Sequence, residues 1–280
     1  MKAYDQWWRQ VQGYPPKTTL FHYTNYQGLE GILKSKEIWL TDVRYLNDTT
    51  ELEYGLEFVS ETLQEYMRKY NSMTNFVLPT LSNLKNLSRK KANLTAYAAC
   101  FCESNRVLSQ WIRYADEGHG YAMGFDAEKL PVGKNLNLFK VFYDPAEQRE
   151  IIWTYLDREV RKPLEKDEMS HEMAHAYLGN LIACLTCFKH SVFEEEREWR
   201  LVFTHDISSF FRKLQFRQYD RFIIPYFALD LVGSSGELPI VKVSQGHQFD
   251  KPLGEEALGL FLEKQGVRVE IDTFDVPLAI

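Results

Sequence analysis

Short segments rich in aromatic and β-branched residues recur along the chain, and helical patterns separate them in no regular order. Such segments predict β-strands, because these side chains pack well on a pleated surface. The predicted strands are Thr19–Thr24, Ile38–Thr41, Ala96–Cys102, His119–Phe125, Phe139–Tyr143, Glu198–Thr204, Arg221–Pro225, Pro239–Val243 and Val267–Ile271.

Apolar residues at helical spacing predict helices over residues 1–13, Tyr26–Ser35 and Glu51–Tyr70, and helices broken near Pro163 over about 151–190. Residues 71–93 are rich in Asn, Ser, Lys and Thr, which predicts a loop or a marginal helix. Strands and helices in mixed order favour one α+β domain over residues 1–280, with an N-terminal helix and the 151–190 region as a helical insertion.

Charge and hydropathy exclude several classes of protein. The chain is 45% hydrophobic and carries a formal charge of −6, which argues against a broad nucleic-acid footprint. It has no apolar run of about 18 residues, and its first ten residues lack the apolar core of a signal peptide. We therefore expect a cytoplasmic protein that makes no membrane contact.

The four cysteines form two close pairs, Cys100 with Cys102 and Cys184 with Cys187. Four thiolates in two pairs are a pattern that zinc sites use. Here the first pair lies in a predicted strand and the second in a helix-like run, where small cysteines commonly pack in the core of a reduced protein. Packing is the preferred interpretation, and no metal site is predicted.

The segment from Phe193 to Val202 places charged residues along a run that ends as a strand. Alternate side chains of a strand share a face, so Glu196, Glu198 and Arg200 would project together. A carboxylate held ionised beside an arginine suits a site that stabilises developing positive charge. The alternative is a solvated edge strand with ordinary charge alternation.

Three further segments carry candidate binding residues. The first strand contains His22, Tyr23 and Thr24, of which His22 and Thr24 share a face. For this strand the alternative is a hydrogen-bonded core histidine. The other candidates are Tyr45, Asn47 and Asp48 before a helix N-terminus, and Ser109, Trp111 and Tyr114 in an aromatic stretch. For the segment before the helix the alternative is a simple capped turn, and for the aromatic stretch it is that the rings fill the core.

Four separated blocks of this sequence resemble an uncharacterised, mainly bacterial family of unknown function. They are LFHYT at 20–24, Asn47-Asp48 with Glu51, the block FCESNRVLSQWIRYADEGHGYAMGFD at 101–126, and the Glu196-x-Glu198-x-Arg200 strand. A weaker echo is FDVPLA at 274–279. That family in turn is similar to the ADP-ribosyltransferase-like superfamily, in which an early strand supplies a His or Arg and a late strand supplies a Glu.

The superfamily resemblance implies a split, mixed or antiparallel half-barrel sheet that binds NAD as a substrate in an extended pose. It implies that Glu198 stabilises the ribose during cleavage, that Glu196 positions the acceptor, and that His22 contacts the ribose near the nicotinamide. The usual central Ser or Tyr motif is not obvious in this chain, so Tyr45 or the segment 109–114 must replace it. The sequence contains no GxGxxG phosphate-binding motif, and this is consistent with such a fold.

These observations lead to an expected NAD-consuming enzyme. It would transfer ADP-ribose to a macromolecular acceptor, protein or nucleic acid, or would hydrolyse NAD, as a bacterial toxin or an anti-phage effector. The alternative from another class is a non-catalytic nucleotide-sensing or protein-interaction module of a defence system. A nuclease would need a cluster of metal-binding carboxylates, and the acidic residues here are too scattered to predict one.

Overall fold

A computed structural model describes residues 2–46, 49–88, 94–133, 135–206, 211–219, 222–233, 236–248 and 250–275. The larger helices are α1 (Ala3–Val11), α2 (Tyr26–Ser35), α3 (Thr49–Lys69), α4 (Thr74–Ser88), α5 (Leu108–Tyr114), α6 (Pro145–Tyr155), α7 (Lys162–Glu165), α8 (His171–Leu185) and α10 (Lys251–Lys264). The strands are β1 (Thr19–Thr24), β2 (Glu37–Asp42), β3 (Leu94–Cys102), β4 (Tyr121–Asp126), β5 (Leu136–Lys140), β6 (Glu198–Asp206), β7 (Gln215–Tyr219), β8 (Phe222–Asp230), β9 (Ile240–Gln245) and β10 (Glu270–Thr273).

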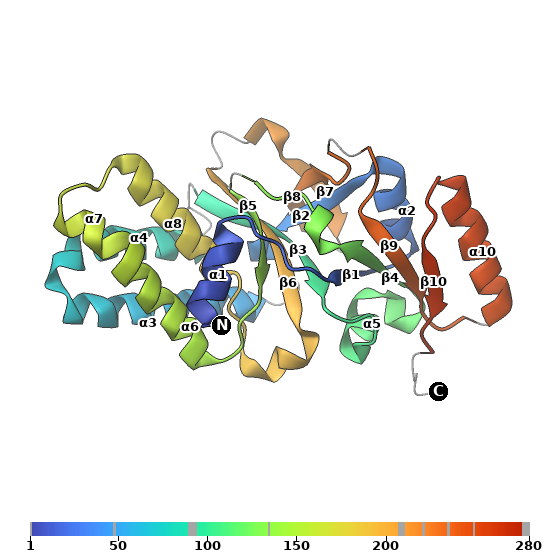
Figure 1. Cartoon of the computed structure of the whole chain (residues 1–280), viewed down its shortest axis with the longest axis horizontal. Coiled ribbons are helices and arrows are strands. Elements are labelled where there is room, and N and C mark those ends of the chain that lie inside the picture. The colour runs from blue at the N-terminus through green and yellow to red at the C-terminus, as the bar shows by residue number, and fades with distance from the viewer. Residues whose placement is uncertain are drawn as a thin grey trace.

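The described strands form one mixed, open sheet in the order β10-β9-β4-β1-β3-β2-β8-β7, with β6 paired to β3 and β5. All pairs are antiparallel except β9 with β10. The chain is therefore a single α+β fold, as predicted. Helices α3, α4, α6, α7 and α8 gather at one end of the molecule and α10 lies at the other (Figure 1).

The sheet opens between β1 and β2. One edge of β3 pairs with β6 along its whole length, from Leu94 to Cys102. On the other edge, β1 meets β3 only at Phe21 with Cys102, and β2 meets β3 only around Ala98. The middle of β3 therefore faces a gap in the sheet, because β1 and β2 diverge there.

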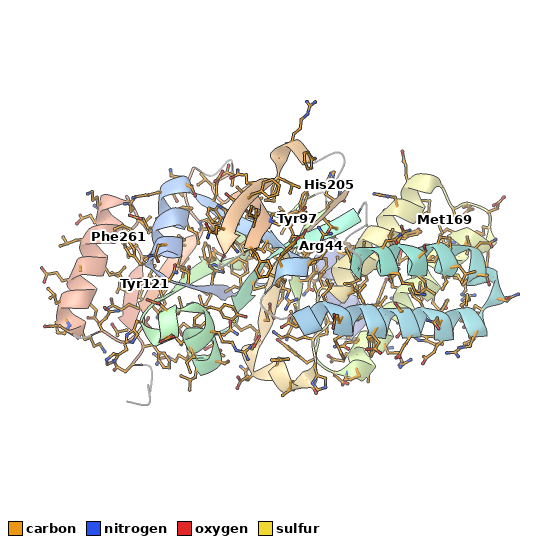
Figure 2. The ribbon with its side chains drawn as sticks, turned by 180° about the vertical axis from the view of Figure 1, so that it is seen from behind. Arg44, Tyr97, Tyr121, Met169, His205 and Phe261 are labelled. Carbon is orange, nitrogen blue, oxygen red and sulfur yellow. The ribbon has the colours of Figure 1, made fainter. Side chains whose placement is uncertain are left out.

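Two apolar clusters lie on opposite faces of the sheet. One joins Ala98 and Val202 to the helices α3, α4, α6 and α8. The other joins Phe101 and Leu201 to α2 and α10. Figure 2 shows Met169 in the helical part at one end of the molecule and Phe261 on α10 at the other end.

Local sequence signals account for several helix starts. The Asn25 side chain accepts a hydrogen bond from the Gly28 N–H at 3.0 Å and caps α2. Asp144, Ser170 and Asp250 cap α6, α8 and α10 in the same way. The predicted bounds of β1 and α2 are confirmed to the residue.

Several predicted elements are wrong or displaced. The 71–93 region, predicted as a loop or a marginal helix, contains the 15-residue helix α4, because Phe76, Val77, Leu81 and Leu84 bury an apolar stripe that outweighs its poor helix formers. The predicted break near Pro163 lies slightly later, at residues 166–170 between α7 and α8, since a π-helical stretch at Leu156–Arg161 leads directly into α7, where the proline occupies the first turn.

Other differences concern the second half of the chain. The strand predicted at Phe139–Tyr143 lies earlier, at Leu136–Lys140, and that predicted at Val267–Ile271 lies later, at Glu270–Thr273. Neither β7 nor α10 was predicted. Arg221 and the proposed turn at Asn47 and Asp48 lie outside the described residues.

Candidate functional site

A cavity of about 890 Å³ occupies the gap between β1 and β2. Its walls come from β1 and α2 on one side, β2 on the other, and α5 with the turn before β6. The cavity is of the size of small-molecule sites. Eight of the predicted site residues line it, namely His22, Tyr23, Thr24, Tyr45, Tyr114, Glu196, Glu198 and Arg200.

The acidic end of the cavity is an ion cluster, which we define as Glu51, Lys189, Glu196, Glu198 and Arg200. The Lys189 ammonium contacts all three carboxylates, at 2.7 Å from Glu51, 2.6 Å from Glu196 and 3.1 Å from Glu198. The Arg200 guanidinium holds both oxygens of Glu198, at 2.7 and 2.9 Å, and one oxygen of Glu51 at 2.6 Å. The cluster thus opposes three carboxylates with two cations.

The geometry of β6 explains why Glu198 and Arg200 meet. They share a face of a strand that lies between β3 and β5, and each is only 4% exposed. The alternative of a solvated edge strand is therefore wrong. The Glu198 N–H donates to the Tyr143 hydroxyl at 2.9 Å, and Arg200 also donates to the Thr186 carbonyl at 2.6 Å.

Glu196 reaches the cluster by a different route from the one predicted. It ends a 3₁₀ turn, Ser191–Glu196, rather than lying in the strand, and Arg197 takes a left-handed conformation with φ 43°. This reversal, rather than strand alternation, brings Glu196 beside Glu198. The other oxygen of Glu196 lies 4.0 Å from the half-exposed Arg113.

The two carboxyl groups have opposite pKa shifts. Burial raises the pKa of Glu198, but the charges of Arg200 and Lys189 outweigh burial and hold it well below the usual value. Burial raises the pKa of Glu196, and the Lys189 charge does not fully offset it. Neighbouring carboxyls with separated pKa values are typical of sites that assign them different roles in proton transfer.

Tyr114 lies close to this cluster. Its pKa is raised to about 12, first by burial and then by the charges of Cys100 and Glu198. The phenol therefore stays protonated near neutral pH and keeps a hydrogen-bond donor beside the cavity. The 109–119 segment forms part of the wall through Gln110, Ile112, Arg113, Tyr114 and nearby acidic residues.

Trp111 is the clearest correction to the predicted site. It is fully buried, contacts Tyr23 edge-on at 5.3 Å and donates to the Asn105 carbonyl at 2.8 Å. It packs in a small core behind Phe21 and Cys102, which line the cavity, and is not itself a lining residue. Ser109 also lies outside that lining. Spacing on one helical turn could not distinguish the two sides of so short a helix as α5.

His22 belongs by register to the opposite face of the sheet from Glu198, because Phe21 is the residue that faces Cys102. It lines the cavity nonetheless, since its Nδ1 lies 2.9 Å from the Cys100 carbonyl at the opening between β1 and β2. A carbonyl only accepts, so Nδ1 carries the proton and Nε2 is left as an acceptor. His22, Tyr45 and Glu198 therefore line one cavity from two faces of the sheet.

The environment of His22 predicts a dependence of stability on pH. Burial lowers the pKa of His22, and the nearby Arg217 charge lowers it further. Between about pH 6.5 and the lowered value, the unfolded chain binds a proton that the folded chain does not. Stability is therefore full above about pH 6.5 and falls with pH, by up to about 1.4 kcal/mol for each unit.

We expect His22→Asn, which keeps a donor near Cys100 but does not titrate, to lose this component. Urea unfolding of both proteins at about pH 7.5 and about pH 5.5 measures it. All other histidines are common to the two proteins and cancel in the comparison. An identical pH response in the variant would contradict a lowered pKa at His22.

Helix α3 is tied to the ion cluster through Glu51, and a glycine allows the approach. A Cβ on Gly55 would lie 2.3 Å from the carbonyl oxygen of Leu185, near the end of α8. That contact is with backbone, so α3 would have to move, and Glu51 with it. We expect Gly55→Ala to lower the free energy of unfolding by about 1–3 kcal/mol.

Gly31→Ala is the matched control for this variant. Gly31 also lies within a helix, and no other part of the described structure is within 4 Å of its Cβ position. Alanine there should leave stability unchanged or raise it by up to about 1 kcal/mol. Equal effects of the two substitutions in urea unfolding would show that α3 is not tightly docked.

Sequence reasoning missed Lys189 as a site residue and named Glu51 only as part of a turn. Lys189 follows the apolar run of α8, where a lysine is ordinary, and its three partners are revealed only by the fold. Trp39 and Arg217 were also missed. Trp39 is 43% exposed at the cavity wall, with the Arg217 guanidinium 5.6 Å from its ring centre.

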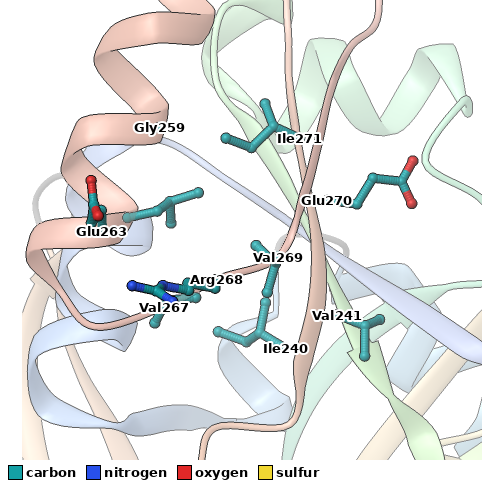
Figure 3. A pocket seen from close by; sticks show the side chains of 10 residues that line it. Ile240, Val241, Gly259, Glu263, Val267, Arg268, Val269, Glu270 and Ile271 are labelled. Carbon is teal, nitrogen blue, oxygen red and sulfur yellow. The ribbon is translucent and has the colours of Figure 1, made fainter.

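A second hollow of about 660 Å³ lies between α10 and the strands β9 and β10 (Figure 3). Most residues that line it are apolar, such as Ile240, Val269 and Ile271. The charged residues in its lining are Glu263, Arg268 and Glu270. It has no counterpart of the ion cluster among its lining residues. The cavity between β1 and β2 is therefore the candidate site.

The cysteines and the helices complete the description. Cys102, Cys184 and Cys187 are buried, Cys100 is partly exposed on the cavity wall, and none forms a disulfide. Among the described residues, no group of three His, Cys, Asp or Glu side chains is placed to hold a metal ion. None of the described helices combines the length and the apolar character needed to cross a bilayer.

Comparison with known proteins gives one match. Residues 110–201 match a family described as a protein of unknown function, DUF2971, which agrees with the resemblance to an uncharacterised domain family. The matched region covers less than half of the chain and includes Lys189, Glu196, Glu198 and Arg200, but not His22 or Glu51. No curated protein and no solved structure matches the sequence.

Proposed function

We propose that this protein consumes NAD, breaking the bond between nicotinamide and ribose and passing ADP-ribose to a macromolecular acceptor or to water. The observation that carries the proposal is the cavity between β1 and β2, whose wall combines Glu198 and Glu196 with His22 and Tyr114. The opening of the sheet at this point supports the resemblance to the ADP-ribosyltransferase-like fold.

The lining fits the chemical parts of a dinucleotide. Exposed or partly exposed rings, Trp39 and Tyr45 among them, offer surfaces for a flat base. Arg113 and Arg217 also line the cavity, and guanidinium groups suit phosphates. The carboxylates lie at the end that would receive the ribose.

In the proposed reaction the nicotinamide leaves with the electron pair of the C–N bond, and positive charge develops on the ribose. Glu198, kept ionised by Arg200 and Lys189, stabilises that charge, which grows only in the transition state. The acceptor forms the new bond to the ribose and gives its proton to Glu196, whose raised pKa suits a base.

The direct test is incubation of the pure protein with NAD, followed by chromatography for free nicotinamide. ADP-ribose in solution would identify a hydrolase, and label retained from adenine-labelled NAD on added protein or nucleic acid would identify a transferase. Heat-denatured protein is the control. Absence of nicotinamide release with every acceptor class would contradict the enzymatic proposal.

The second candidate is a nucleotide-sensing or protein-interaction module of a defence system. The observation that favours it is the engagement of Glu198, since Arg200 and Lys189 already contact both of its oxygens. A site of this kind would bind NAD, seen as a shift in melting temperature with NAD concentration, and would release no nicotinamide.

A further inference from the structure

The β7–β8 hairpin lies at the outer edge of the sheet (Figure 1), and Arg217 and Gln218 of β7 line the cavity. Large apolar side chains are unusually exposed on it, including Phe216, Phe222 and Ile223. Phe216 and Ile223 project from one face of the hairpin and Phe222 from the other, so both faces present exposed apolar side chains.

One face of this hairpin is continuous with the cavity wall. Thr41 pairs with Tyr226, and Arg217 pairs with Ile224, so Trp39, Arg217 and Phe222 project to the same side. The Arg217 guanidinium donates to the Thr41 hydroxyl at 3.0 Å and lies over the Trp39 ring. We define Trp39, Arg217 and Phe222 as the hairpin face, and Arg212 and Lys213 lie in the turn that precedes β7.

The hairpin face combines aromatic rings with positive charge. Trp39 and Phe222 are exposed, and Arg212 and Lys213 lie on the surface before β7. The sequence from 211 to 229 contains four cationic residues and one acidic residue, Asp220, although the chain as a whole carries −6. The nearest acidic residues along β8 and β2 are Asp230 and Glu37, at the opposite end of β8 from Phe222.

We propose that the hairpin face binds single-stranded nucleic acid and leads it to the cavity. Proteins that bind single strands combine cations that follow the backbone with aromatic rings on which bases stack. A duplex would hide its bases, so these rings favour a single strand. Trp39 pairs with Ala228, six residues along β8 from Phe222, which is about 20 Å of strand and enough for several nucleotides.

This inference goes beyond the proposed function, and binding at this face needs no NAD. The probe is a fluorescein-labelled oligothymidylate of about 12 nucleotides, followed by fluorescence anisotropy at several salt concentrations. We expect saturable binding whose affinity falls with salt, with a logarithmic slope of about −2 for three phosphate contacts. The same oligonucleotide annealed to its complement should bind more weakly.

Two neighbouring exposed residues provide a matched pair of variants. Phe222 is 65% exposed on the hairpin face, and Ile223 is 71% exposed on the opposite face. We expect Phe222→Ala to weaken binding by about 5- to 100-fold, through loss of one stacked base. Ile223→Ala should leave the affinity unchanged, and Arg212→Gln should lower the salt slope by about 0.7.

Several results would overturn the inference. They are absence of binding at low salt, affinity that does not depend on salt, or equal losses for Phe222→Ala and Ile223→Ala. Light scattering tests a protein partner, since a dimer that dissociates in Phe222→Ala would assign this face to a second copy of the chain. Because binding is measured without NAD, its failure is distinct from failure of NAD cleavage.

Discussion

Lys189→Met is expected to destabilise the protein by about 3–5 kcal/mol at neutral pH. Lys189 lies within 3.1 Å of three buried or partly buried carboxylates, and methionine preserves most of its volume while removing its charge. Arg200 would then face Glu51 and Glu198 without a second cation, and Glu196 would keep the half-exposed Arg113 at 4.0 Å. Urea unfolding monitored by tryptophan fluorescence measures the change in free energy.

The dependence of this loss on pH identifies its cause. Without Lys189 the folded-state pKa of Glu196, already raised, would rise further, so the variant binds a proton more readily when folded. Stability is then regained as pH falls through that raised pKa. The double variant Lys189→Met with Glu196→Gln should likewise recover part of the loss at neutral pH.

The control for charge removal alone is Lys17→Met. Lys17 forms a solvent-exposed ion pair with Glu128 at 3.6 Å, and such pairs contribute little to stability. We expect this substitution to change the free energy of unfolding by less than about 0.5 kcal/mol. If Lys189→Met changed the free energy of unfolding as little, the charge of Lys189 would not be needed to balance the buried carboxylates of the ion cluster.

Glu198→Gln is expected to reduce NAD cleavage by about 10²- to 10³-fold, since the group that stabilises the developing charge is removed and its shape is kept. Its effect on stability should be smaller than that of Lys189→Met. With glutamine at this position the cluster holds two carboxylates and two cations, and Arg200 keeps its contact with Glu51 at 2.6 Å. Nicotinamide release and urea unfolding are measured on the same preparation.

Glu195→Gln is the matched control, because Glu195 lies exposed in the turn that precedes Glu198. It should retain both turnover and stability. Full turnover in Glu198→Gln would remove this residue from the mechanism. A loss of stability as large as that of Lys189→Met, with residual folded protein fully active, would instead give Glu198 a structural role.

The sequence predicts those parts of the fold where local and tertiary preferences agree. The segment TLFHYT and the Asn25-capped helix after it have unambiguous signals, and both were found as predicted. Helix α4 contains Pro79 and many poor helix formers, so only its packing against the helical core explains it. Helix α10 has a capping aspartate and an early proline, which are local signals for a helix start.

The candidate site was predictable where its residues share one strand. Alternation along β6 correctly paired Glu198 with Arg200, but it could not show that β6 is internal to the sheet. Glu51 and Lys189 lie far from β6 or outside its periodicity, and their contacts depend on how α3 and α8 dock. The left-handed conformation of Arg197 positions Glu196, and an arginine at this position of the sequence gives no indication of that conformation.

The opening in the sheet also exposes main-chain groups. In an antiparallel strand the N–H and C=O of one residue point to the same side, so the amide of Cys100 faces the gap together with the carbonyl that meets His22. Cys100 itself lines the cavity. Side-chain substitution at this position leaves that amide in place, so alanine scanning of the cavity will underestimate recognition by the backbone, and only a change to the peptide bond itself would reveal it.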